Sequence, residues 1–277
     1  MPFTVIRGTF HVVGYEPDGD SFKFKAKRES NWAELSGPKV EMNSKGHVQL
    51  RFEAIDALET HYQGAHQPKK LADVATDLLL DMAGIQNVKW GPKHRRVSKA
   101  DDGVDGFILS RAAEKFHRAV CFVYAGTTDL EDGSEMYLKA PLLKKSLNYK
   151  LVQAGLVYPT YYYSLFSDLR EVITAAVEEA RSAHKGLWAK DKSDGVTVSS
   201  LKSITDVHPI LPKLFRRLVV YVKSHPSVAG FKQHLADNPE EVLILPQAHV
   251  THFDTIIKQQ GKRIGLTVLP ENLVFKP

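Results

Sequence analysis

One arginine and two carboxylates follow one another at short spacing near residue 50. Apolar and polar residues alternate from Val48 to Ala54, which predicts a strand with Arg51 on its polar face. The alternation then ends, and Asp56 and Glu59 follow within a few residues. Such a strand end suits a cation and a phosphate bound side by side, because carboxylates bind cations and arginine donates to phosphate oxygens. The alternative is a salt-bridged strand end in which Arg51 pairs with Glu53 or Asp56.

Composition limits the class of protein. The 277 residues are 43% hydrophobic, enough for one large core or two smaller ones. No apolar run approaches the roughly 20 residues of a membrane span, so no membrane partner is expected. The N-terminal segment lacks the pattern of a secretory signal, and the single cysteine, Cys121, excludes an intrachain disulfide. A cytoplasmic protein is expected, with export by another route left open, and Cys121 is expected to be a small buried side chain.

The net charge of +5 is unevenly distributed. From Gly195 to the C-terminus there are ten Lys and Arg residues against six Asp and Glu. A basic excess of this kind fits a phosphate-facing surface, and an ordinary solvated surface is the alternative.

The elements that must position the arginine and the carboxylates are several short strands and a few helices. Strands are expected over 3–13, 21–27 and 48–55, then at 88–90, 107–109 and 118–124. Helical spacing of apolar residues predicts helices over 71–82, 138–156 and 168–185. The long connections 29–45 and 91–106 are polar, and 91–106 is expected to be a mobile loop.

Composition changes at residues 191–200, which predicts a linker and a domain boundary. Beyond it, helices are expected over 210–222, 228–235 and 253–259, and strands over 242–245 and 264–269. The chain is therefore predicted to consist of a first domain, residues 1–192, and a small α+β domain, residues 193–277. Short strands with a helix among them favour a five-stranded oligonucleotide-binding (OB-fold) barrel for the first domain.

With its charged residues in place, the first domain resembles the staphylococcal nuclease-like family over about residues 3–190. The family's Asp-Gly-Asp-Thr turn is met by Asp18-Gly19-Asp20-Ser21, and its Arg, Asp and Glu are met by Arg51, Asp56 and Glu59. Its Lys-Tyr-Gly-Arg is met by Lys115-Phe116-His117-Arg118. Its Val-x-x-Gly-Leu helix end with following tyrosines is met by Val152–Leu156, Tyr161 and Tyr163. Each piece alone is weak, whereas the ordered set favours membership.

The resemblance implies a role for each matching residue. Arg51 and Arg118 would donate to the phosphoryl oxygens, and Glu59 would act as general base or orient the attacking water. Asp20, Asp56 and the carbonyl of Ala57 would bind Ca²⁺, with Mg²⁺ as the alternative, because hard cations prefer oxygen ligands. Lys115, Tyr161 and Tyr163 would contact the substrate, although tyrosines that merely close the barrel are the alternative. His249 and His252 are the nearest pattern to a zinc site and are more often surface residues.

Two positions depart from the family pattern. Ala57-Leu58-Glu59 lacks the proline that commonly precedes the family's glutamate, which is expected to loosen Glu59. Phe116 replaces a tyrosine and removes a hydroxyl that could touch a phosphate.

The expected function is therefore metal-dependent, sequence-nonspecific hydrolysis of phosphodiester bonds in DNA, RNA or both, with 3′-phosphate products. One alternative is a catalytically weak or inactive OB-fold module that binds nucleic acid. Another is a nuclease domain that its C-terminal domain targets to a protein partner or to a second copy of the chain.

Overall fold

The computed structural model describes residues 2–276, which form two compact units. The first unit contains the residues up to Ile55 and Asp73–Leu151, and the second contains Asp56–Ala72 and the residues from Val152 onward. This division does not coincide with a boundary at residue 192. The separate folding of 1–192 and 193–277 stays a prediction.

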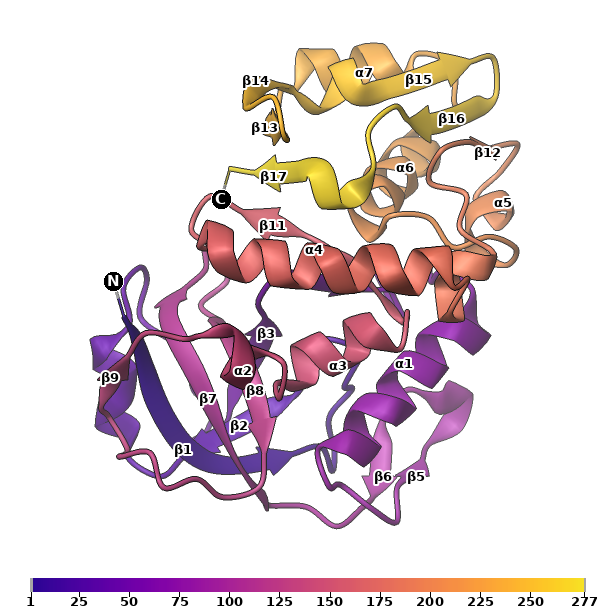
Figure 1. Cartoon of the computed structure of the whole chain (residues 1–277). Helices are drawn as coiled ribbons and strands as arrows, with labels where there is room; N and C mark the ends of the chain where they lie inside the picture. Colours follow the sequence, from indigo (N-terminus) through magenta and orange to yellow (C-terminus); the bar gives the residue numbers. More distant parts are fainter. Residues whose placement is uncertain (1, 277) are drawn as a thin grey trace. The chain divides into compact units, whose positions relative to one another are not determined.

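The first unit is a closed five-stranded barrel (Figure 1). Its strands are β1 (Phe3–His11), β2 (Lys23–Ala26), β3 (Val48–Phe52), β7 (Val104–Ala113) and β8 (Ala119–Ala125). They pair in the order β2-β3-β8-β7-β1, and β1 closes the barrel onto β2. Among these five described strands, β3 and β8 form the one parallel pair, and the other neighbours are antiparallel. The predicted OB-fold barrel is confirmed.

Alternating apolar residues fill the barrel. Val5, Phe10, Leu50 and Phe122 are all at most 1% exposed, and the rings of Phe10 and Phe22 are 4.8 Å apart. Glycine is required where the wall closes, because a Cβ on Gly106 would meet the Phe10 ring at 2.1 Å.

Short elements surround the barrel. The strands are β5 (Lys89–Trp90), β6 (Val97–Lys99) and β9 (Glu135–Met136), and the helices are α1 (Lys69–Met82), α2 (Ala140–Leu143) and α3 (Leu147–Gln153). Two 3-10 helices, Glu29–Glu34 and Pro92–His94, lie in the long connections.

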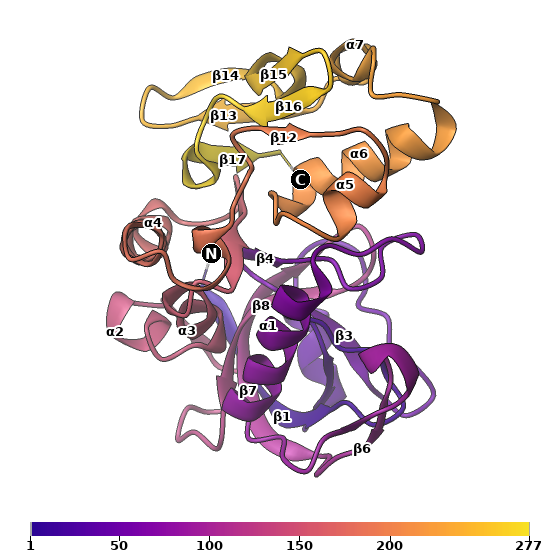
Figure 2. The same ribbon diagram turned by 90° about the vertical axis from the view of Figure 1, so that its right-hand side faces the viewer.

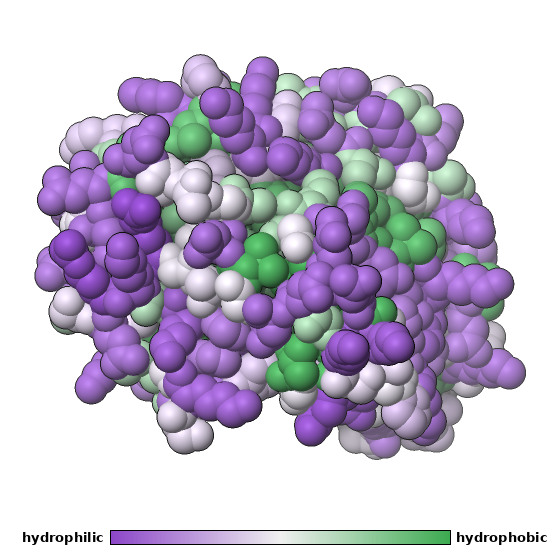
Figure 3. Space-filling view, turned by 90° about the horizontal axis from the view of Figure 1, so that it is seen from below, coloured by the Kyte–Doolittle hydropathy of each residue, from purple (hydrophilic) through white to green (hydrophobic). Residues whose placement is uncertain are grey.

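On the face in Figure 3, hydrophilic residues predominate and hydrophobic ones form small separate areas.

Two predictions about these connections are wrong. The expected helix 138–156 is two helices, because Ser146 accepts the N–H of Tyr149 at 3.1 Å and thereby caps α3. The expected mobile loop 91–106 contains β6, which pairs with β5, and the beginning of β7.

The second unit has three small sheets. β4 (Ile55–Ala57) pairs with β10 (Val157–Pro159). The four-stranded sheet has the order β11 (Tyr161–Tyr162), β17 (Leu273–Phe275), β13 (Glu241–Ile244), β14 (His249–His252). The three-stranded sheet consists of β12 (Val196–Thr197), β16 (Arg263–Leu266) and β15 (Ile257–Gln260), which lie side by side in Figure 2.

Among residues 2–276, four helices lie wholly in this unit: α4 (Ser167–Ser182), α5 (Lys202–Thr205), α6 (Pro212–Ser224) and α7 (Phe231–Asp237). Shorter 3-10 turns lie at Gly186–Ala189, Phe253–Ile256 and Pro270–Asn272. The helix predicted over 253–259 is wrong. Its second half is β15, which pairs with β16 through the turn at Gly261. No helix within residues 2–276 has both the length and the apolar character needed to cross a membrane.

Candidate active site

The barrel places Arg51 on β3 and Arg118 directly before the neighbouring strand β8. β3 and β8 run parallel with Arg51 opposite Val120, and Arg118 precedes Val120 by two residues. Side chains two residues apart on a strand point to the same side. Arg51 and Val120 are both partly exposed while their strand neighbours are buried, so this side faces outward. Arg51 therefore lies on the outer face of the barrel, and Arg118 lies two residues before its partner on β8.

Each arginine has an acidic neighbour within the barrel. Arg118 Nε donates to Glu114 Oε1 at 2.9 Å across the hairpin that joins β7 to β8. Burial raises the pKa of Glu53, and the positive charges of Arg51 and Arg111 oppose that rise. The attraction between Arg51 and Glu53 supports part of the salt-bridge alternative.

The tip of the β7–β8 hairpin carries an exposed aromatic ring. Phe116 is 63% exposed. The Lys115 ammonium lies 5.5 Å and the Arg118 guanidinium 5.8 Å from the centre of its ring. His117 adopts the left-handed backbone conformation that the tight turn requires, with φ of 62°. A flat apolar surface beside two cations suits a nucleobase and its phosphate.

Asp20 lies in the turn that precedes β2, also within the barrel unit. Asp18 and Ser21 exchange backbone hydrogen bonds, and the carbonyl of Asp20 accepts the N–H of Phe52 at 3.1 Å. The predicted turn is confirmed, and it lies beside the end of β3.

Asp56 and Glu59 belong to the second unit, where an arginine from α6 binds both. Arg216 Nη1 and Nη2 donate to Asp56 Oδ1 and Oδ2 at 3.0 and 2.6 Å, and Nη1 also donates to Glu59 Oε1 at 2.5 Å. Burial alone would lower the pKa of Arg216, but the attraction and hydrogen bonds of the two carboxylates outweigh burial and raise it well above its usual value. The cluster therefore holds a permanent guanidinium charge between two candidate catalytic carboxylates.

A buried glutamine holds the backbone of Glu59. Gln67 is 0% exposed, its side-chain carbonyl accepts the Glu59 N–H at 3.2 Å, and its own N–H donates to the Glu59 carbonyl at 2.8 Å. Leu58, in the position of the missing proline, is 1% exposed. The segment is thus fixed by Gln67 and by burial of Leu58, which offsets the loosening expected from the lost proline.

The residues present do not fit a bound metal ion in this arrangement. Within residues 2–276, no three His, Cys, Asp or Glu side chains gather as a metal set. Both side-chain oxygens of Asp56, the central predicted ligand, bind Arg216. His249 and His252 are an odd number of residues apart on β14, so they point to opposite faces of the strand and form no zinc pair.

The two tyrosines have different environments. Tyr161 is 0% exposed, and its hydroxyl bonds with Thr174 of α4 at 2.9 Å. The ring is therefore packed in the core and is not accessible for the expected contact with substrate. Tyr163 is 41% exposed, and its hydroxyl donates to Glu241 at 3.1 Å. Tyr163 and Lys115 stay predicted contacts.

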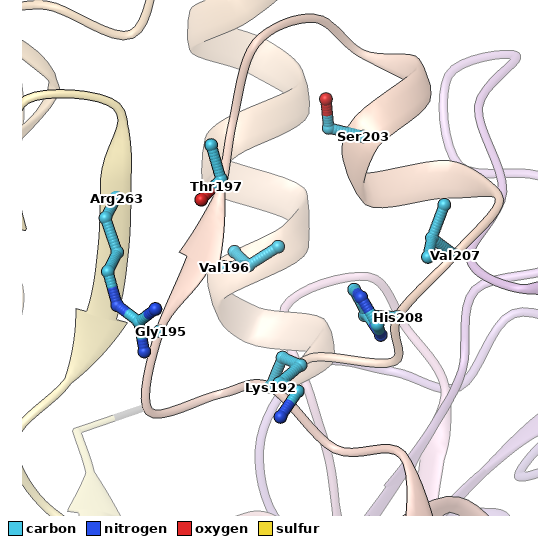
Figure 4. A pocket seen from close by; sticks show the side chains of 8 residues that line it. All are labelled: Lys192, Gly195, Val196, Thr197, Ser203, Val207, His208 and Arg263. Atoms are coloured by element: carbon cyan, nitrogen blue, oxygen red, sulfur yellow. The ribbon is translucent and has the colours of Figure 1, made fainter.

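A second candidate place is a pocket of about 380 Å³ in the second unit (Figure 4). Its lining includes the basic side chains of Lys192, His208 and Arg263 and the hydroxyls of Thr197 and Ser203. None of the ion pairs found within residues 2–276 involves the three basic side chains. A basic, hydroxyl-lined hollow of this kind suits an anion.

The closed five-stranded barrel is an OB fold of the nuclease type. The family model described as staphylococcal nuclease homologue matches residues 49–190, and the chain belongs to this family. The matched range contains Arg51, Asp56, Glu59 and Arg118 but neither Asp20 nor Arg216. No curated protein matches the chain.

Sequence reasoning missed Arg216 and Gln67. Arg216 follows Asp56 by 160 residues, and no local pattern connects positions so far apart. The one available signal was the pair Arg216-Arg217 inside an apolar helix, since buried cations need acidic partners.

Proposed function

We propose that the chain is a nuclease that hydrolyses phosphodiester bonds of DNA, RNA or both with little sequence preference and leaves 3′-phosphate ends. The observation that supports the proposal is the position of Arg51 on β3 and of Arg118 directly before the paired strand β8, in a barrel of the staphylococcal nuclease family. In a nuclease the two guanidinium groups bind the phosphoryl oxygens and stabilise the charge that develops on them. Glu59 takes a proton from the attacking water or orients it.

The metal requirement is a separate part of the proposal. The family resemblance implies Ca²⁺, with Mg²⁺ as the alternative, at Asp20, Asp56 and Ala57. Because Arg216 binds Asp56, no step of the mechanism proposed above depends on a metal ion. Cleavage with Ca²⁺, with Mg²⁺ and with a chelator therefore measures the requirement directly.

The test is cleavage of single- and double-stranded DNA and RNA by the full chain and by three variants. Glu59→Gln, Arg51→Ala and Arg118→Ala are each expected to lose at least about a hundredfold in kcat, the scale of removing a base or a transition-state donor. Arg96→Ala is the matched control, because Arg96 is 66% exposed and pairs with Glu16, which is not a predicted site residue. Full activity of the Glu59 variant would refute the proposed mechanism.

A second candidate is a module that binds nucleic acid without cleaving it. The engagement of Asp56 and Glu59 by Arg216 favours this candidate, because it occupies both groups that the reaction would use. A module of this kind would bind oligonucleotides equally well with and without metal. No added cation would produce cleavage, and Glu59→Gln would leave binding unchanged.

A further inference from the structure

The helix α6 is attached to the segment that carries Asp56 and Glu59 at three places. Just before the helix begins, the Gln67 side chain donates to the carbonyl of Ile210 at 2.7 Å. In its middle, Arg216 binds Asp56 and Glu59. Near its end, the Lys223 ammonium donates to the carbonyl of Gln63. These contacts fix the register of the helix along the segment.

Neighbouring cations of α6 have a different partner. Lys213 Nζ lies 2.8 Å from Glu240, Arg217 also pairs with Glu240, and Arg217 donates to the carbonyl of Lys213. Burial lowers the pKa of Lys213 to about 8 and that of Arg217 to about 10. Of these three cations, Arg216 is the one that donates hydrogen bonds to both Asp56 and Glu59, while Arg217 acts on Asp56 through its charge.

We infer that Arg216 is the resident cation of the Asp56–Glu59 pair and excludes a divalent cation from it. Asp56 has two side-chain oxygens, and the two nitrogens of the planar guanidinium bind one each, as in a fork. A divalent cation needs the same oxygens and would lie against a fixed positive charge. The native chain therefore binds Ca²⁺ and Mg²⁺ weakly at this pair, and loss of the guanidinium creates a metal site there.

The consequence for cleavage rests on the proposed function, whereas the consequence for metal binding does not. If the family's metal-assisted cleavage uses this pair, Arg216 restrains it. A variant without Arg216 should then cleave faster in the presence of Ca²⁺ than the native chain does. If Arg216 instead takes part in the reaction, the same variant should cleave more slowly.

The experiment titrates Ca²⁺ and Mg²⁺ into the full chain and into Arg216→Gln by calorimetry, with thermal unfolding recorded beside it. Arg216→Gln is expected to bind Ca²⁺ at least about tenfold more tightly than the native chain, because two carboxylates lose their fixed counter-charge. The rise in unfolding temperature on adding Ca²⁺ should likewise be larger for the variant, since a ligand stabilises the state that binds it. Arg216→Lys, which keeps the charge, should resemble the native chain.

Arg217→Gln is the matched control, because it removes the same charge from the same helix but from a residue that pairs with Glu240. It should change Ca²⁺ affinity much less than Arg216→Gln does, because the charge of Arg217 acts on Asp56 from a distance. Equal Ca²⁺ affinity of the native chain and Arg216→Gln would overturn the inference. If Arg216→Gln does not fold, native and Asp56→Asn chains are compared instead. Equal weak binding supports the inference, and loss of a tight native site in Asp56→Asn overturns it.

Cleavage assays on the same samples separate the two proposals. Gain of Ca²⁺ binding by Arg216→Gln without cleavage of any nucleic acid would leave the inference standing and refute the nuclease. Cleavage by the native chain with Ca²⁺ bound at Asp56 would support the nuclease and refute the inference.

Discussion

The exposed ring of Phe116 predicts a contribution of a single residue to oligonucleotide binding. Base stacking on an aromatic ring is worth about 1–3 kcal/mol per base, so Phe116→Ala should weaken binding of single-stranded oligonucleotides by about fivefold or more. Phe116→Tyr should keep the affinity, because it keeps the ring. Fluorescence anisotropy with a labelled oligonucleotide measures both. An unchanged dissociation constant for Phe116→Ala would show that the ring takes no part.

His47 is expected to make the stability of the barrel depend on pH. It is 7% exposed, its Nδ1 bonds with the Tyr15 hydroxyl at 3.0 Å, and its ring stacks on that of His11 at 4.0 Å. Burial, with the nearby positive charges of His11 and Lys25, lowers its pKa to about 4, although Asp102 opposes this. His47 is therefore protonated near pH 6.5 in the unfolded chain, but only near pH 4 in the folded chain.

The sign of the effect follows from that difference. The contribution of His47 to the free energy of unfolding is fully present above pH 6.5. It falls by about 1–3 kcal/mol as the pH decreases from about 6.5 to 4. His47→Gln should flatten the decrease, as measured by urea unfolding at pH 7.5 and 4.5. His249→Gln, at an exposed position, should leave it in place. A steep decrease that persists in His47→Gln would assign it to other groups.

At the scale of elements, α3 fastens β3 to β8 through one side chain. Asn148 is 0% exposed, accepts the Val123 N–H at 3.0 Å, and donates to the carbonyls of Glu53 and Cys121 at 2.9 and 3.1 Å. Asn148→Leu removes the partner of the Val123 N–H and of the Glu53 carbonyl, whereas the Cys121 carbonyl still accepts the Glu53 N–H at 2.8 Å. The variant should lower the free energy of unfolding by about 3 kcal/mol. Lys150→Ala, on the exposed side of α3, is the control and should change it little. A loss below 1 kcal/mol would mean that the parallel pair needs no such support.

Patterns in the sequence predicted the elements whose stability is local or repetitive. Alternation located β1, β2 and β3, and helical spacing located α1, α4 and α6. The barrel followed from the order of these elements and from the family's charged residues. The parallel pairing of β3 with β8 places Arg51 opposite Val120, two residues after Arg118, and the catalytic roles of both arginines stay predictions.

Elements that depend on distant contacts were not predictable in this way. The apolar residues Phe253, Ile256 and Ile257 have helical spacing, yet pairing with β16 makes Ile257–Gln260 a strand. Likewise, nothing near Asp56 in the sequence indicates that its partner is Arg216 rather than a metal ion. Tertiary contacts decide both cases, because local preferences differ by only about 1 kcal/mol.

Across the chain as a whole, part of the C-terminal excess of basic residues lies at the pocket of the second unit. The C-terminal excess of basic residues includes Arg263, whose guanidinium lies so close to Gly195 that a Cβ there would meet it at 2.4 Å. Figure 4 shows Arg263 extending toward Gly195 from one side of the pocket and Lys192 and His208 on the other. Glycine therefore leaves room for the guanidinium, and the basic side chains surround a space open to an anion.

This arrangement predicts a contribution of the pocket to the salt dependence of nucleic-acid binding. Each phosphate contact adds about 0.9 to the slope of log K against log salt on duplex DNA, so Lys192→Ala with Arg263→Ala should reduce the slope by about 1–2. Lys232→Ala with Lys258→Ala removes the same charge from exposed positions outside the pocket. If the two double variants have equal slopes, only net charge matters. A smaller slope in the pocket variant, with cleavage per bound substrate unchanged, would identify the pocket as a phosphate contact that holds the substrate and takes no part in the reaction.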